Sequence, residues 1–204
     1  MRNPTRTLAV AAAVLATAAA VLAGCGTSAT APSGSGAGSS TVTTPAPENN
    51  PAGDIPDNQA FVPFTPPTGL FTVSVPEGWA RSTDGAATIF TDKLNTVRIE
   101  TRPLATAPNT ESVSVDELPA IASSTPGYRP GTVTAVQRKA GPVMLITYLA
   151  ASPLNPVTGK TGTDAIERYA FWRDGREVIL TLSGPVGADN VDPWRTITDS
   201  LQWR

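Results

Sequence analysis

Short stretches in which apolar and polar residues alternate recur from residue 71 onward, and they restrict the fold more than any other feature of the chain. A period of two places successive side chains on opposite faces of a β-strand, so that one face can be buried. Segments rich in Val, Ile, Thr, Tyr and Phe favour such strands. We expect strands at residues 71–75, 87–92, 96–102, 132–138, 142–151, 164–173 and 177–183.

Turn residues separate these strands. Asp84-Gly85 and Leu94-Asn95 lie between the first three strands, which we expect to form a meander. Asp174-Gly175 predicts a type I′ hairpin, because that turn needs positive φ at both central residues. Most neighbouring strands are therefore expected to pair antiparallel.

Two segments have helical signals. Ser114 and Glu117 have the spacing of a capping box, and Pro126-Gly127 ends the helix that would follow. Asp192 precedes Pro193 and is expected to cap a second helix. The apolar residues of that helix recur at three- and four-residue spacings, at Val191, Trp194, Ile197 and Leu201. Strands outnumber helices, which predicts an α+β fold with an antiparallel sheet of about six or seven strands flanked by helices.

The amino terminus has the pattern of a secretory signal. Arg2 and Arg6 precede an apolar run that is too short for a transmembrane span of about 20 residues. The run ends in Leu22-Ala23-Gly24-Cys25, which resembles a bacterial lipobox. That resemblance implies cleavage before Cys25, a diacylglycerol on its sulfur and an acyl group such as palmitate on the new amino terminus. Several acyl chains hold a protein at a membrane, whereas one binds marginally.

These features divide the chain into three parts. Residues 1–24 are the expected signal peptide, and residues 25–60 are the lipidated amino terminus and a disordered linker. Gly, Ser, Thr, Ala, Pro and Asn dominate this linker, and such a composition cannot bury enough apolar surface to fold. Residues 61–204 are expected to form a single α+β domain. We expect the protein to be lipid-anchored at the extracytoplasmic face of the cell membrane.

Composition argues against most kinds of chemistry. The chain has no histidine, and its one cysteine is the predicted lipid attachment site, so no cofactor, metal site or catalytic residue is predicted. It also has no Ser-x-x-Lys pair and no Gly-x-Ser-x-Gly motif. Of its 15 basic and 17 acidic residues, only Arg2 and Arg6 lie before Cys25, which leaves the rest of the chain at −4. This acidic balance makes nucleic acid an unsuitable partner.

Three sets of side chains remain as candidates. The acid pairs Asp164 with Glu167 and Asp189 with Asp192 could serve acid–base chemistry or a hard cation, although capping and solvation explain them better. The arginines near the predicted hairpin could meet anionic headgroups, but a solvated edge is the simpler interpretation; they are Arg168, Arg173 and Arg176. The large aromatic residues could line a groove, although core positions are the commoner role; they are Trp79, Trp172, Trp194, Trp203, Tyr128, Tyr148 and Tyr169.

Three segments carry a family resemblance: residues 71–79, 169–178 and 194–203. Together they resemble the PsbP-like domain and, more narrowly, the actinobacterial LpqN/LpqT lipoprotein family. The resemblance implies a central antiparallel sheet sandwiched by helices, and a noncatalytic accessory or assembly role in the cell envelope. Because a fold alone does not fix function, this role is an expectation.

We therefore expect a membrane-anchored, noncatalytic binding or accessory module. Its expected partners are the membrane, through the lipid anchor, and an envelope lipid or a membrane protein complex. A purely structural assembly factor and a cell-wall hydrolase are the alternatives.

Overall fold

The computed structural model describes residues 51–155 and 157–204. The predicted signal peptide, the lipobox residues Leu22, Ala23 and Gly24, and Cys25 lie outside the described residues. Residues 25–50 of the predicted linker lie outside them as well, whereas residues 51–60 are described.

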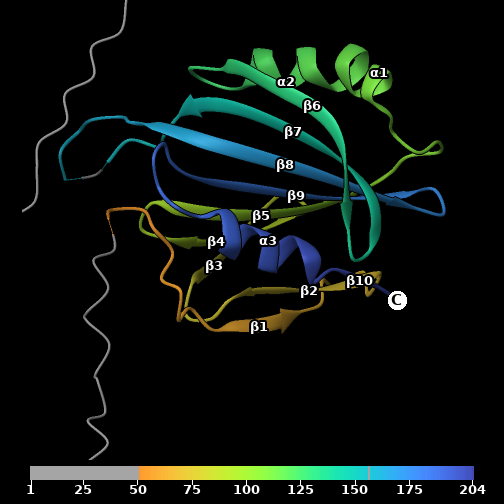
Figure 1. Ribbon diagram of the computed structural model, residues 1–204, viewed down its shortest axis with the longest axis horizontal. Coiled ribbons are helices and arrows are strands. Elements are labelled where there is room, and N and C mark those ends of the chain that lie inside the picture. The colour runs from red at the N-terminus through yellow and green to blue at the C-terminus, as the bar shows by residue number, and fades with distance from the viewer. Residues whose placement is uncertain (1–50, 156) are drawn as a thin grey trace, which may run out of the picture. The chain divides into compact units, whose positions relative to one another are not determined.

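A seven-stranded antiparallel sheet forms the centre of the domain (Figure 1). Its strand order is β3-β4-β5-β9-β8-β7-β6. The bounds are Ala80–Asp84 for β3, Ala87–Asp92 for β4, Asn95–Pro103 for β5, Arg129–Arg138 for β6, Gly141–Ala151 for β7, Thr163–Arg173 for β8 and Arg176–Pro185 for β9. Six of these strands match predicted ones closely, and the α+β class is confirmed.

The turn between β8 and β9 is the predicted hairpin. Asp174 has a φ of 48° and Gly175 a φ of 76°, the positive values that a type I′ turn requires. Pairing of Arg173 with Arg176 closes the ladder directly at this turn.

A second, three-stranded sheet has the order β1-β2-β10. Its strands are β1 (Phe61–Phe64), β2 (Phe71–Pro76) and β10 (Gln202–Trp203). The predicted meander is therefore correct for β4 and β5, which pair antiparallel, but wrong for β2, which pairs with β1 and the end of the chain. The position next to β4 is occupied by β3, a strand with every residue exposed. Such a strand has no buried face and leaves no alternating pattern in the sequence.

One helical run precedes β6 and consists of α1 (Thr110–Ser112), the π-helix η1 (Val113–Glu117) and α2 (Leu118–Ser124). The predicted start at Ser114 is wrong, because Asn109 caps the run and exchanges hydrogen bonds with Ser112. The last helix, α3, covers Val191–Asp199 and starts after Asn190, so Asp192 lies in its first turn and is not its cap. Asn190 makes no capping hydrogen bond itself, since its side chain contacts other parts of the domain.

The two faces of the large sheet are covered by different elements (Figure 1). Side chains such as Val97 and Leu180 pack against the small sheet and α3 in the larger core cluster. Trp194, Ile197 and Leu201 of the predicted apolar stripe belong to this core, whereas Val191 is 66% exposed and does not. On the opposite face, residues of β7 and β8 pack beneath the helical run in a second cluster, which consists of Val113, Met144, Ile146, Tyr148, Ala150, Ile166 and Ala170.

Contacts with the domain begin ahead of residue 61, the predicted boundary. Ile55 is buried, and its backbone amide donates to Asn190 Oδ1 at 2.8 Å. The carbonyl oxygen of Gly53 accepts from Asn190 Nδ2 and from Asn95 Nδ2, each at 3.0 Å. Gly184 makes room for this cluster, because a Cβ there would lie 2.4 Å from Asn95 Oδ1. Two buried amide side chains thus fix the start of the folded part to β5 and α3.

Candidate functional site

The helical run covers only part of its face of the large sheet. Between η1–α2 and the strands β5, β8 and β9 lies an open groove of about 380 Å³. A second hollow of about 240 Å³ continues from it toward β3 and shares Arg98, Glu100, Arg102 and Arg168 with it. Charged residues make up half or more of the lining of each, and we call the two hollows together the charged groove.

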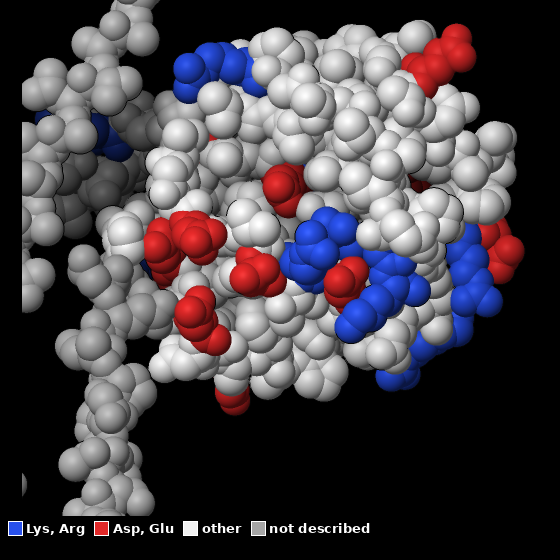
Figure 2. All heavy atoms as spheres, in the orientation of Figure 1, with Lys and Arg blue, Asp and Glu red and all other residues white. Residues whose placement is uncertain are grey.

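Acidic and basic side chains alternate along the charged groove. The ion-pair network along the groove consists of four carboxylates and three guanidinium groups, those of Asp84, Glu100, Glu117, Glu177, Arg98, Arg102 and Arg168. Asp116 also lines the groove, whereas Glu177 lies beside it. Charges of both signs also occur on the face shown in Figure 2, where a basic group at the centre right includes an acidic side chain and further acidic side chains lie toward the left.

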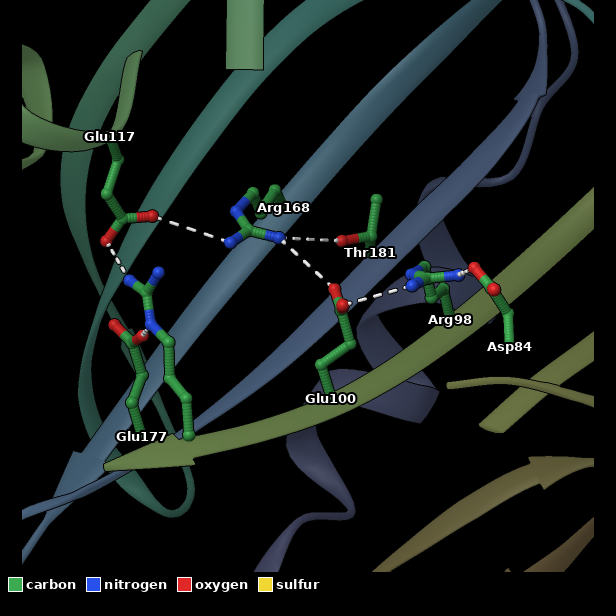
Figure 3. Close-up of polar contacts among 8 residues, drawn as sticks. Asp84, Arg98, Glu100, Glu117, Arg168, Glu177 and Thr181 are labelled. Atoms are coloured by element: carbon green, nitrogen blue, oxygen red, sulfur yellow. Dashed lines mark hydrogen bonds and ion pairs between the residues drawn. The ribbon is translucent and has the colours of Figure 1, made fainter. Parts of the chain in front are cut away.

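One half of the network lies on β5 and β8 (Figure 3). Arg98 contacts Asp84 at 2.8 Å and Glu100 at 3.1 Å. Arg168 contacts Glu100 at 3.6 Å and Glu117 at 3.5 Å, and it donates to Thr181 Oγ1 at 3.4 Å. The side chain of Arg168 is only 13% exposed, so its charge relies on these neighbours and not on solvent.

The other half joins the helical run to the sheet. Arg102 contacts Glu117 at 2.6 Å and donates through Nε to Glu177. Glu177 is fully buried, and this desolvation raises the pKa of its carboxyl, while the neighbouring guanidinium of Arg102 opposes the rise. Glu117 therefore contacts two arginines at once and holds the helical run against the sheet.

Local sequence explains how these side chains meet. On β5, Arg98, Glu100 and Arg102 alternate with the buried Val97 and Ile99, so all three charges point to one face. Glu117 is the last residue of the π-helix. Such wide helical turns are rare and often occur at functional sites. The sequence pattern identified Glu117 only as a capping residue, and the alternating charge signs on β5 were the signal that it missed.

Two buried polar atoms of the groove lack a hydrogen-bond partner within the described part of the chain. They are Arg168 Nε and Glu177 Oε1. Buried polar atoms are rarely left unpaired, because the loss of their hydration costs free energy. Arg168 lines both hollows of the groove, so one of these atoms belongs to a side chain that a bound molecule would meet.

The acid pairs singled out from the sequence do not form sites. Asp164 and Glu167 lie on opposite faces of β8, and Glu167 accepts a hydrogen bond from Tyr169 Oη at 2.6 Å. Asp189 and Asp192 are exposed around the start of α3. Among residues 51–155 and 157–204, no three acidic, histidine or cysteine side chains gather in a way that could hold a metal ion.

The three arginines near the hairpin behave differently from one another. Arg173 and Arg176 are exposed, and Arg173 contacts Asp174 at 3.3 Å. Arg168 does not lie on a solvated edge, because its side chain points to the groove face of β8 and contacts Glu100 and Glu117.

The aromatic residues do not line a common groove. Trp194 and Tyr169 are buried in the larger core cluster, with Trp79 and Trp203 packed partly against it. The others lie on the helix-covered face: the rings of Tyr128 and Tyr148 are 5.5 Å apart, and Trp172 donates to the carbonyl of Leu104 at 2.7 Å. Core packing therefore accounts for most of them.

Comparison with known proteins identifies the fold. The sequence matches no protein-family model and no curated protein. The structure is similar to cyanobacterial PsbP (CyanoP) from Synechocystis sp. PCC 6803, with a TM-score of 0.53 and 10% identity over 75% of this chain and 99% of that chain. The fold is therefore PsbP-like.

Two further structures match with lower scores. LpqN, described as involved in cell envelope biogenesis of Mycobacterium tuberculosis, has a TM-score of 0.43 and 14% identity over 72% of this chain and 91% of that chain. A crystal structure from Bacteroides thetaiotaomicron VPI-5482 has a TM-score of 0.47 and 13% identity, and the match covers 70% of this chain but 48% of that one. In the part of the chain that the structure describes, no helix is long and apolar enough to span a membrane.

Proposed function

We propose that this protein is an exported lipoprotein of the cell envelope, anchored through Cys25, whose PsbP-like domain is a noncatalytic binding module. Membership in the LpqN/LpqT group of lipoproteins is part of this proposal. The lipobox pattern at Leu22-Ala23-Gly24-Cys25 supports the anchor, and the charged groove supports binding.

The observation that carries the binding role is the position of Arg168. Its side chain is largely buried at the wall of an open groove, and one of its nitrogen atoms lacks a partner among the described residues. The groove is lined by charges of both signs, and such a surface favours a polar partner over a hydrocarbon chain. The headgroup of an envelope lipid or a polar segment of a membrane protein complex would fit this description.

The anchor is tested by a Cys25→Ser variant of the full chain. We expect the wild-type protein to partition into the detergent phase and to carry the mass of a lipidated, cleaved chain, because several acyl chains bind it to the membrane. The variant should remain in the aqueous phase with an unlipidated mass. Ser28→Ala, a change in the same segment, is the matched control and should behave like wild type. Equal partitioning of wild type and Cys25→Ser would contradict the anchor.

The groove is tested by site-specific photocrosslinking in the native envelope. A photoreactive residue at Ala120, an exposed residue of α2 that lines the groove, should give a defined crosslinked product. The same residue at Ser123, exposed on α2 but not lining the groove, is the matched control. We expect Arg168→Met to abolish the product from position 120. Identical products from positions 120 and 123, or a product that survives Arg168→Met, would argue against the groove as the binding site.

A further inference from the structure

A larger cavity lies beyond the charged groove on the same face of the sheet. Its volume is about 670 Å³, and it extends from the β4–β5 turn to the loop between β7 and β8. Thr96 and Ser183 form part of its floor, and they are cross-strand partners two pairs along the ladder from Arg98 and Thr181, on the same face. The cavity is therefore separate from the ion-pair network, although the same strands build both.

Asp164 supplies a buried carboxyl group to this cavity. Strand pairing places it opposite Pro185, on the face that Ser183 and Ile166 share. The residue is only 6% exposed, and burial raises the pKa of its carboxyl. No hydrogen bond or charge from the described residues opposes that rise. Because this largely buried carboxyl has no donor among the described residues, a donor that entered the cavity would bind favourably there.

Two lysines and several apolar residues complete the cavity. Lys93 and Lys160 are exposed residues on two different loops that line it. Leu94 and Leu154 also line it, and their side chains stay largely exposed at 41% and 63%. The cavity thus combines one deep negative group with two positive groups that are open to solvent.

We propose that this cavity binds a small zwitterion, with its primary ammonium group at Asp164 and its anionic group at Lys93 and Lys160. An ammonium group alone would match Asp164 but would be repelled by the lysines, and an anion alone would be repelled by Asp164. A molecule that carries both groups on a short carbon chain satisfies all three residues. Such chemistry occurs in the phosphoethanolamine headgroup and in free amino acids.

The test is calorimetric titration of the detergent-solubilised full chain with O-phosphorylethanolamine. Phosphorylcholine is the matched control ligand, because its quaternary ammonium has no N–H to donate to Asp164. We expect phosphorylethanolamine to bind about tenfold more tightly, the effect of roughly one good hydrogen bond. Titration with β-alanine distinguishes two classes of zwitterion. If β-alanine binds more tightly than phosphorylethanolamine, the site favours carboxylate zwitterions; if it binds more weakly, the site favours phosphate esters.

Substitution separates binding from folding. Asp164→Asn should weaken phosphorylethanolamine binding about tenfold or more, while thermal stability stays equal or rises, because a buried uncompensated charge is removed. Lys93→Gln with Lys160→Gln should also weaken binding, and Asp189→Asn, an exposed acid outside the cavity, should leave it unchanged. Undetectable binding to the wild-type chain, or unchanged binding to Asp164→Asn, would overturn the proposal. Because the charged groove is intact in these variants, either result would leave its role unaffected.

Discussion

The two faces of the seven-stranded sheet differ at β5 and β9, where one face is apolar and the other is charged. Neighbouring residues of the same strands build both faces. On β5 and β9, Val97 and Leu180 are completely buried beneath α3 and the small sheet. Arg98 and Thr181, the next residues along, face the charged groove. A strand thus carries a buried apolar face and a charged face that lines the groove, with a period of two residues.

The difference arises from what covers each face. The small sheet and α3 close the apolar side, and the side chains there form a continuous core. The helical run on the opposite side packs mainly over β7 and β8 and leaves β5 and β9 to polar side chains. Charges are tolerated in that open strip because they can pair and remain partly hydrated.

The contrast between the two faces predicts the largest difference in stability for substitutions at two adjacent residues of β9. Leu180→Ala should lower the free energy of unfolding by about 2–5 kcal/mol, because it opens a cavity in the core. Thr181→Ala on the opposite face should cost less than about 1 kcal/mol, since it removes only a long hydrogen bond from Arg168. Urea-induced unfolding of both variants measures the difference. Equal losses of unfolding free energy in the two variants would show that both faces contribute equally to stability and would contradict the contrast between them.

A smaller effect is expected inside the ion-pair network. Glu117→Gln leaves Arg102 and Arg168 with one carboxylate fewer, and we expect a loss of about 1–3 kcal/mol in unfolding free energy. Asp84→Asn is the control, because Asp84 is 69% exposed and should contribute at most about 0.5 kcal/mol. Urea unfolding at low and high salt provides the measurement. The effect of Glu117→Gln should resist salt better than that of Asp84→Asn, and a reversed order would refute the idea that Glu117 holds the helical run against the sheet.

The smallest effect concerns a polar group on the apolar face. Burial and the hydrogen bond to Glu167 raise the pKa of Tyr169 to about 12. The folded protein therefore keeps its phenol proton at pH values where the unfolded chain, with a pKa near 10, has lost it. By linkage the contribution of Tyr169 to stability is complete below pH 10 and disappears as the pH rises to about 12.

Absorbance titration of phenolate formation measures the ionisation of the Tyr169 phenol. Tyr169→Phe should remove the latest-titrating tyrosine and cost about 1–2 kcal/mol at neutral pH, because the hydrogen bonds to Glu167 and from Arg138 are both lost. The rest of the phenolate signal should not change. A variant that keeps the high-pH step would assign it to another tyrosine.

Sequence reasoning found most strands but not the site. Alternation identified β5 because Val97 and Ile99 are buried on one side. The same alternation makes Arg98, Glu100 and Arg102 resemble a solvated face, and nothing local shows that Glu117, fifteen residues beyond Arg102, returns to meet them. Pairing of β2 with the end of the chain was missed for the same reason, since such long-range contacts leave no periodic signal. Asp164 was noticed, but as half of an acid pair whose other member lies on the opposite face.

The asparagine contacts at Gly53 have a mechanical consequence. Asn95 belongs to β5 and Asn190 precedes α3, and both donate to the same carbonyl oxygen. A force that pulls on the chain before Gly53 acts through these hydrogen bonds on β5 and α3 before it acts on the edge strand β1. The domain would therefore resist pulling from its amino-terminal side by shearing interior bonds, and β1 would be protected from being peeled away.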